Sequence, residues 1–267
     1  MTDLLDVYRA QFKVTLATQI QYRTELLIWL SGAILQPVVY LIVWATVARS
    51  NGGDVGGYSV SSFAAYYITM MLIDHLTFTW IMYEFEPRIR EGAFSPKLVR
   101  PVHPIHSDVA DNFTHKFLGL FPLVPVAVAL AIIFHPVFQT QVWALALLLP
   151  SLVLACALRF VVEWTLALAA FWVTRVGAVN QLYEVALIVL SGFMAPLSLF
   201  PTPIQVVAAI APFRWMLAFP VELALGRVSQ HDALVGVGVQ TIWLIVALVA
   251  LQIVWRSAVR HYSAVGA

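Results

Sequence analysis

The sequence predicts an all-α polytopic membrane protein, with six transmembrane helices, an interfacial helix ahead of them and short re-entrant helices between spans five and six. Of its 267 residues, 61% are hydrophobic and 11% are charged, whereas about a quarter of the residues of a soluble domain are charged. The apolar residues gather in stretches that match the roughly 20 residues a helix needs to cross a bilayer. The chain has room for about six such stretches with their loops, so we expect one transmembrane domain over residues 1–267 and no separate soluble domain.

An amphipathic helix is expected over residues 3–23, ahead of the first span. Apolar residues recur there at helical spacing: Leu5, Tyr8, Phe12, Leu16 and Ile20. Charged residues such as Asp6, Arg9 and Lys13 occupy the other faces. This pattern indicates a helix that lies in the membrane interface. The alternative is a solvated lead-in to the first span.

The first three spans are expected over residues 26–48, 63–83 and 108–134. The first has no charge over 23 residues and one proline, Pro37, at which it can kink. A glycine-rich turn that begins at Asn51 separates it from the second. The third is apolar over residues 117–134, where Pro122 and Pro125 are expected to bend its start.

The last three spans are expected over residues 142–174, 176–199 and 233–255. The fourth is too long for one straight crossing, so it is either tilted or broken near Pro150. Residues 200–226 are different, because they are interrupted by Pro201, Pro203, Pro212 and Pro220. Two short helices that dip back into the membrane fit this segment best, since non-helical backbone at membrane depth must be buried in protein or line a wet cavity.

The charges predict the orientation of the chain. Residues 84–104 gather seven formal charges and four prolines in an otherwise apolar sequence, so this loop must lie in water. In a six-span arrangement, eleven of the 15 Lys and Arg residues fall on the side of the chain ends, three fall opposite (Arg49, Arg214 and Arg227), and Arg159 stays in the membrane. Because Lys and Arg favour the cytoplasmic side, both termini and the charged loop are expected in the cytoplasm.

Motifs for nucleotide binding, metal binding and covalent catalysis are absent from the sequence. There is no G-x-x-x-x-G-K-[ST] phosphate loop, so any ATP must bind another chain. There is no H-E-x-x-H, no G-x-S-x-G and only one cysteine, Cys156, and the seven histidines do not cluster at ligand spacing. We therefore expect no catalytic residue, metal or cofactor on this chain. The formal charge of +1 gives no reason to expect nucleic acid.

Four ionisable residues are expected within the spans, where such residues are costly and are functional candidates by default: Asp74, Arg159, Glu163 and Glu184. Arg159 and Glu163 are four residues apart on one helix and can pair, the alternative being a role in the substrate path or in gating. Asp74 either meets Arg159 across the bundle or faces an aqueous path. Glu184 is close enough to the inner interface for plain hydration; otherwise Asp74 and Glu184 would suit a cationic or amphipathic cargo.

Several segments together resemble one family. They are the interfacial helix, Pro87-Arg-Ile-Arg-Glu-Gly-Ala-Phe, Leu98-Val-Arg-Pro-Val, Ser191-Gly-Phe-Met-Ala-Pro-Leu-Ser-Leu-Phe-Pro, Ala211-Pro-Phe-Arg-Trp and Phe219-Pro-Val-Glu. In this order they resemble the permease subunits of type 2 ABC exporters, in the branch of single-permease chains that pair with a separately encoded ATPase. The resemblance covers nearly the whole chain.

The resemblance implies roles for two segments. The loop after span two would form a coupling helix seated on the ATPase, which maps onto Glu86, Pro87, Arg88, Arg90, Glu91 and Gly92. The proline-broken segment would close the translocation path outside, and its gate residues would be Pro196, Pro201, Pro212, Arg214 and Glu222. ATP and Mg²⁺ would bind a dimer of ATPase subunits.

The resemblance also implies an assembly and a cargo class. One six-span chain forms half of a path, so a second permease, identical or related, would complete it within the lipids of a prokaryotic cytoplasmic membrane. The cargo would be a hydrophobic, amphipathic or cationic compound or a lipid, moved by rigid-body rocking. Two alternatives remain: loop 84–104 is merely solvated and orients the chain, or the protein is a secondary transporter or channel that needs no ATPase.

Overall fold

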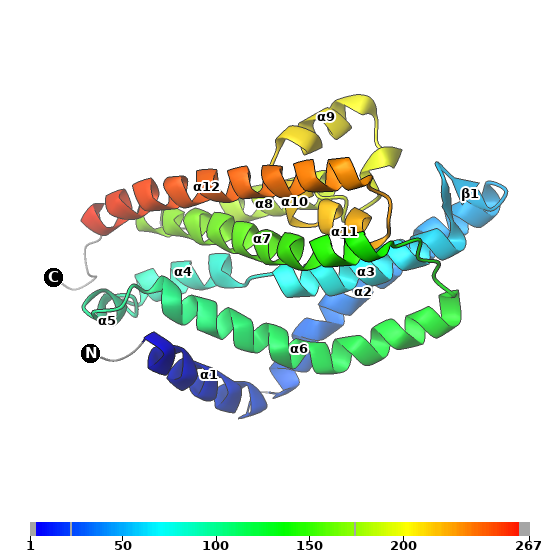
Figure 1. Cartoon of the computed structure of the whole chain (residues 1–267). Coiled ribbons are helices and arrows are strands. Elements are labelled where there is room, and N and C mark those ends of the chain that lie inside the picture. Colours follow the sequence, from blue (N-terminus) through cyan, green and yellow to red (C-terminus); the bar gives the residue numbers. More distant parts are fainter. Residues whose placement is uncertain (1–3, 22, 174, 262–267) are drawn as a thin grey trace.

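The computed structural model describes residues 4–21, 23–173 and 175–261, which form helices and, within those ranges, one two-stranded hairpin (Figure 1). The first half of the chain contains α1 (Leu4–Gln21), α2 (Arg23–Ser50), β1 (Asp54–Val55), β2 (Tyr58–Ser59), α3 (Val60–Thr77), α4 (Ile81–Arg90), α5 (Ser95–Leu98) and α6 (Ile105–Phe134). The second half contains α7 (Val142–Ala167), the 3-10 turn η1 (Leu168–Phe171), α8 (Gly177–Leu190), the 3-10 turn η2 (Leu197–Leu199), α9 (Thr202–Ile210), α10 (Phe213–Met216), α11 (Ala218–Ala224) and α12 (Gln230–His261).

Among the described residues, four helical segments are long and apolar enough to cross a membrane: Ser31–Ser50 within α2, α6, α7 with η1, and α12. The apolar α8 has only 14 residues. Helix α3 has 18 residues and is buried along most of its length, and it is made less apolar by Asp74 and His75. The protein is thus an all-α, multi-pass membrane protein.

The long helices run lengthwise between two ends of the bundle (Figure 1). One end, which we call the terminal end, holds α5 and both ends of the described chain, and the far end holds the β1–β2 hairpin. Helix α1 lies along α6, where Gln11 Nε2 donates to Asp111 Oδ1 over 2.8 Å and Thr15 donates to the same oxygen. The helix expected over 3–23 therefore forms as α1 and packs on the bundle, although residues 1–3 and 22 lie outside the described ranges.

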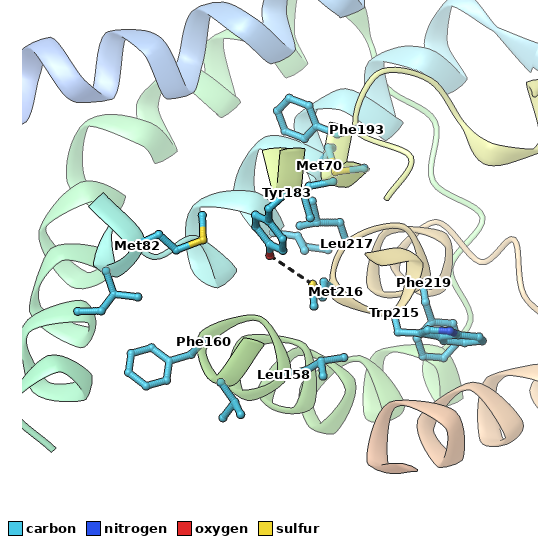
Figure 2. Close-up of a cluster of buried hydrophobic side chains, with 14 of the residues drawn as sticks. Met70, Met82, Leu158, Phe160, Tyr183, Phe193, Trp215, Met216, Leu217 and Phe219 are labelled. Atoms are coloured by element: carbon cyan, nitrogen blue, oxygen red, sulfur yellow. Dashed lines mark hydrogen bonds between the residues drawn. The ribbon is translucent and has the colours of Figure 1, made fainter. Parts of the chain in front are cut away.

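The core is built around α7, which packs against α12, α11, α4 and α3. Side chains from these helices and from α8 converge in one apolar cluster, in which Tyr183 points toward Met216 (Figure 2). Large side chains such as Trp164 and Phe63 are fully buried there. At Gly236 of α12 an added Cβ would come within 2.2 Å of the Phe219 ring, so α12 and α11 can meet closely only because this residue is glycine.

The expected second span over 63–83 is not one helix, because α3 ends at Thr77 and α4 begins at Ile81. Phe78 is extended, with ψ of 144°. The Thr77 hydroxyl donates to the Ile73 carbonyl over 2.9 Å, and Asn112 Nδ2 of α6 donates to the Phe78 carbonyl over 3.2 Å. These side chains provide hydrogen-bond partners for backbone carbonyls at the break. The local sequence does not predict the break, because Asn112 is distant in the chain.

Other boundaries also differ from the expected spans. The expected span over 176–199 ends as a helix at Leu190, followed by Gly192 with φ of +79°, a conformation that favours glycine. The fourth helix continues through Pro150 and ends at Ala167, followed by η1, rather than reaching 174. Helices α2, α6 and α12 all extend beyond the spans expected over 26–48, 108–134 and 233–255. His135 closes α6 in the left-handed conformation.

Residues 200–226, expected to form two short helices, contain α9, α10 and α11, and the 3-10 turn η2 precedes them. The prolines stand where the pieces begin: Pro196 precedes η2, Pro201 precedes α9 and Pro212 precedes α10. This is the position that proline tolerates best, since the first residues of a helix have no backbone acceptor to bond.

Candidate functional site

The charged loop forms a compact elbow at the terminal end. Helix α4 ends at Arg90, and Gly92, with φ of +71°, reverses the chain toward α5. The Phe94 amide donates to the Arg88 carbonyl over 3.0 Å, which closes the turn. The buried Phe94 and Phe85 rings lie 5.3 Å apart, and Phe85 is also 5.3 Å from Trp164 of α7. The elbow is thus anchored in the core by aromatic packing.

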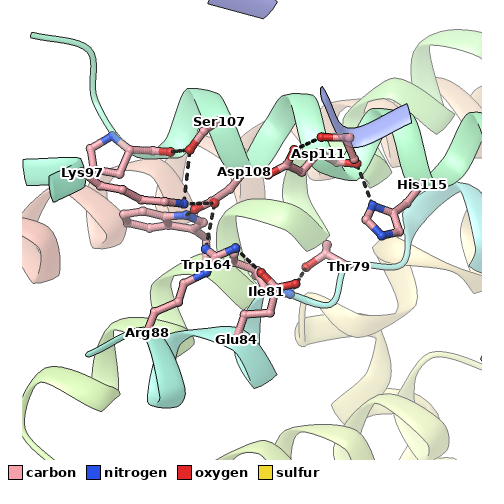
Figure 3. Close-up of polar contacts among 12 residues, drawn as sticks. Thr79, Ile81, Glu84, Arg88, Lys97, Ser107, Asp108, Asp111, His115 and Trp164 are labelled. Carbon is pink, nitrogen blue, oxygen red and sulfur yellow. Dashed lines mark hydrogen bonds and ion pairs between the residues drawn. The ribbon is translucent and has the colours of Figure 1, made fainter. Parts of the chain in front are cut away.

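A buried carboxylate joins the elbow to two long helices (Figure 3). Asp108 of α6 is 3% exposed. Its Oδ1 accepts from Arg88 Nη1 over 2.8 Å and from Lys97 Nζ over 3.2 Å, and its Oδ2 accepts from Trp164 Nε1 over 3.0 Å. Arg88 also pairs with Glu84. We call Glu84, Arg88, Lys97, Asp108 and Trp164 the elbow network.

The expected coupling residues divide into inward and outward groups. Arg88 points into the elbow network and is unsuited to a partner contact. Arg90, with a side chain 59% exposed, and the exposed Glu91 face outward. Glu86 accepts from the Val176 amide over 3.1 Å and so ties the elbow to the start of α8. Fewer of the expected coupling residues therefore face outward than the sequence indicated, because Arg88 and Glu86 are bonded to other parts of the chain.

Two groups at the terminal end have displaced pKa values. Burial raises the pKa of the Glu84 carboxyl above its ordinary value, although the Arg88 guanidinium acts in the opposite direction. Burial lowers the pKa of the His103 imidazole, and the nearby His106 adds to that effect. His103 Nδ1 accepts a hydrogen bond from the Ile105 amide over 3.2 Å, an arrangement that requires the unprotonated nitrogen.

Three of the expected intramembrane residues form one closed cluster. Arg159 Nη1 donates to Asp74 Oδ1 over 2.6 Å and Arg159 Nε donates to Glu163 Oε1 over 2.8 Å. The Thr77 hydroxyl accepts from Arg159 over 3.0 Å, and the Tyr183 hydroxyl donates to Glu163 over 3.0 Å. Asp74 thus meets Arg159 across the bundle, which was one of the two expected arrangements. The arginine is neutralised by carboxylates from α3 and α7.

Glu184 stands apart from this cluster. Its side chain is exposed on α8 and accepts a hydrogen bond from the Tyr83 hydroxyl of α4. The contact links α8 to the helix after the break at residues 78–80. Glu184 does not meet Asp74, so the two do not form a joint site for a cation.

The expected outer-gate residues lie toward the far end. Arg214 Nη2 pairs with Glu222 Oε2 over 2.9 Å, which joins α10 to α11. Two tyrosines of α3 hold the loop after α8: Tyr66 donates to the Gly192 carbonyl over 2.7 Å and Tyr67 donates to the Met194 carbonyl over 2.8 Å. The loop is therefore fixed to α3 by hydrogen bonds that the sequence did not reveal.

A cavity of about 500 Å³ lies between α1, the α3–α4 junction and α6. Helix α6 supplies a polar wall with Asp108, Asp111, Asn112, His115 and Lys116. None of these residues was expected from the sequence to have a site role, and Lys116 was only one of the cations expected to orient the chain. Among the described residues, no group of three or more His, Cys, Asp or Glu side chains could hold a metal ion.

Comparison with known protein families gives a match over most of the chain. The model of a family described as ABC-2 family transporter protein matches residues 34–266, which is most of the chain. A search of curated proteins finds no match.

Proposed function

The chain belongs to the ABC-2 transporter family, and we propose that it is the transmembrane permease subunit of an ATP-driven exporter, coupled to separate ATPase subunits through the α4–α5 elbow. ATP and Mg²⁺ then bind the ATPase dimer, and this chain contributes no catalytic residue. The cargo class that suits such a permease is a hydrophobic, amphipathic or cationic compound or a lipid.

The observation that carries the coupling is the anchoring of the elbow. Arg88 and Lys97 of the elbow share the Asp108 carboxylate of α6, and Trp164 of α7 donates to the same carboxylate. A displacement of Arg90 and Glu91 by a partner is therefore passed to two long helices through buried contacts. A merely solvated loop has no need of such an anchor.

The proposed topology has six membrane crossings with both termini in the cytoplasm of a prokaryotic cell. Four crossings are the long apolar segments, and α3 and α8 supply the other two within the bundle. The segments α9, α10 and α11 re-enter from outside and close the path there, with Arg214 and Glu222 at the gate. The cations of the elbow and of the end of α12 support this orientation, because they gather at one end of the bundle.

A second permease completes the path in this proposal, because one bundle offers half of it. The second chain is either another copy or a related permease. The closed cluster of Asp74, Arg159 and Glu163 then has a structural role, because both of its carboxylates pair with Arg159 and neither is free for an ion-driven mechanism.

Recovery of the ATPase with the tagged chain tests the coupling. The chain is expressed from its native locus, and ATPase subunits retained after solubilisation are counted by mass spectrometry. The double variant Arg90→Glu with Glu91→Arg keeps the net charge but exchanges its pattern, and we expect it to lose most of the retained ATPase. Arg49→Glu is the control, because Arg49 lies in the last turn of α2, next to the β1–β2 hairpin and away from the elbow. This variant should retain the ATPase. Unchanged retention in the double variant would refute coupling through the elbow.

A further inference from the structure

The cavity between α1 and α6 has one polar wall and one apolar wall. The polar wall is the face of α6 that ends at Lys116, and the apolar wall is formed by Ile28, Phe78, Trp80 and Phe160. Ile28 is 70% exposed and Trp80 is 47% exposed, so the apolar wall continues to the outer surface of the bundle. A ligand in such a cavity contacts polar and charged side chains on one side and apolar side chains on the other.

Two of the three carboxylates described on the wall of this cavity are neutralised by cations. Glu84 and Asp108 pair with Arg88, and Asp108 also pairs with Lys97. Asp111 accepts from Gln11 and Thr15 of α1. Both donors are uncharged, so Asp111 keeps its negative charge and is the one carboxylate described on the cavity wall that pairs with no cation.

Lys116 is a cation of the cavity wall that has no carboxylate partner among the described residues. Its side chain is partly buried, and its Nζ forms no hydrogen bond or ion pair with any residue that the structure describes. Asp74 and Glu163 act on it electrostatically but are held by Arg159, which opposes their attraction. An ammonium within a bundle of low dielectric is costly without a counter-ion, so the cavity is complementary to an anion.

The position of Lys116 along α6 indicates the depth of the site. The residue directly precedes the charge-free stretch over 117–134. It therefore lies where the hydrocarbon of the cytoplasmic leaflet gives way to its head groups, which is the level of lipid phosphates and fatty carboxylates. Helix α1, beside it, is the helix expected to lie in the membrane interface.

We propose that this cavity binds an anionic amphiphile, whose phosphate or carboxylate pairs with Lys116 Nζ while its hydrocarbon follows Ile28 and Trp80 out to the bilayer. The site is a property of this chain alone and depends on its membrane placement, not on ATP coupling. The same chemistry is offered by a phospholipid of the cytoplasmic leaflet and by a single-chain amphiphile arriving as cargo.

Native mass spectrometry of the purified chain tests the proposal without ATPase or transport. Three probes with matched chains are titrated: phosphatidylglycerol, the free fatty acid and uncharged diacylglycerol. We expect the two anionic probes to bind about tenfold more tightly than diacylglycerol, which corresponds to one charge-assisted hydrogen bond. Binding by phosphatidylglycerol alone identifies a leaflet lipid, and binding by both anionic probes identifies a site that reads the charge of any amphiphile.

Four variants assign the binding to the cavity. Lys116→Gln should lower the affinity for the anionic probes about tenfold, whereas Lys116→Arg should leave that affinity unchanged. Lys13→Gln, an exposed cation on α1 outside the cavity wall, is the matched control and should bind normally. Thr18→Trp obstructs the cavity from an exposed position on α1 without touching Lys116, and should also weaken binding.

The proposal fails if diacylglycerol binds as tightly as the anionic probes, or if Lys13→Gln weakens binding as much as Lys116→Gln. It also fails if Thr18→Trp binds normally. A thermal unfolding scan accompanies each variant. Because Lys116 has no partner to lose, Lys116→Gln should unfold at the same or a higher temperature without ligand; if it does not fold, Thr18→Trp and the comparison of probes decide the matter.

Discussion

Arg88 Nη1 lies 2.8 Å from Asp108 Oδ1 and joins the elbow after α4 to the first turn of α6. The Asp108 side chain is buried, and its second oxygen, Oδ2, accepts a hydrogen bond from the Trp164 indole of α7. A carboxylate that holds groups from the elbow and from α7 makes them move together.

Asp108→Asn should loosen the elbow and lower the stability of the protein. The change leaves Arg88 and Lys97 without their shared counter-ion, and loss of one member of a buried ion pair costs about 3 kcal/mol. The free energy of unfolding in detergent measures this loss. Glu86→Gln, which alters a more exposed elbow carboxylate, should cost much less. Equal stability of the Asp108→Asn variant and the wild type would contradict a structural anchor.

The sequence predicted the class of the fold because composition and span length decide it. It also predicted that Asp74 could meet Arg159, since an intramembrane acid needs a partner. It did not predict the break at residues 78–80, whose carbonyl is satisfied by Asn112 of another helix. Contacts of this kind join residues distant in the chain and leave no local pattern.

The same limit applies to the candidate site. Arg88 stands in a charged loop and reads as a surface residue, yet Asp108 draws it inward. Lys116 reads as one orienting cation among many, and only the packing of α1 and the α3–α4 junction against α6 makes it a cavity residue. The prolines of the outer segment were informative because proline restricts helix starts locally.

Gly119→Ala should destabilise the contact between α3 and α6. An added Cβ at Gly119 would come within 2.1 Å of the His75 ring, which is buried and bonded to the Lys116 carbonyl over 3.0 Å. Overpacking of this kind costs about 1–3 kcal/mol. Gly238→Ala is the matched control, because nothing lies within 4 Å of its added Cβ. Thermal unfolding of the two variants should differ, with the control unchanged or slightly more stable, and equal loss in both would count against the described contact.

Acidification should destabilise the terminal end through His103. Burial holds the pKa of His103 below that of the unfolded chain, which is about 6.5. Below that pH the unfolded chain binds a proton that the folded chain resists, so the free energy of unfolding falls as the pH drops. His103→Gln removes this contribution and should flatten the loss between pH 7.5 and 5.5, whereas His231→Gln, exposed near the far end, should not. Parallel pH profiles for wild type and His103→Gln would refute the assignment.

Arg159→Met should be more harmful than removal of the whole charge cluster. The single change leaves Asp74 and Glu163 without their shared cation, and an uncompensated buried charge costs about 3–5 kcal/mol. The triple variant Arg159→Met, Asp74→Asn and Glu163→Gln removes every charge of the cluster and should recover much of that stability. Unfolding of the single and triple variants in detergent gives the comparison. If the triple variant folds but no longer supports transport in the assembled complex, the charges have a role in the path as well as in the fold. If it is as unstable as the single variant, mutual neutralisation is not what holds α3 to α7.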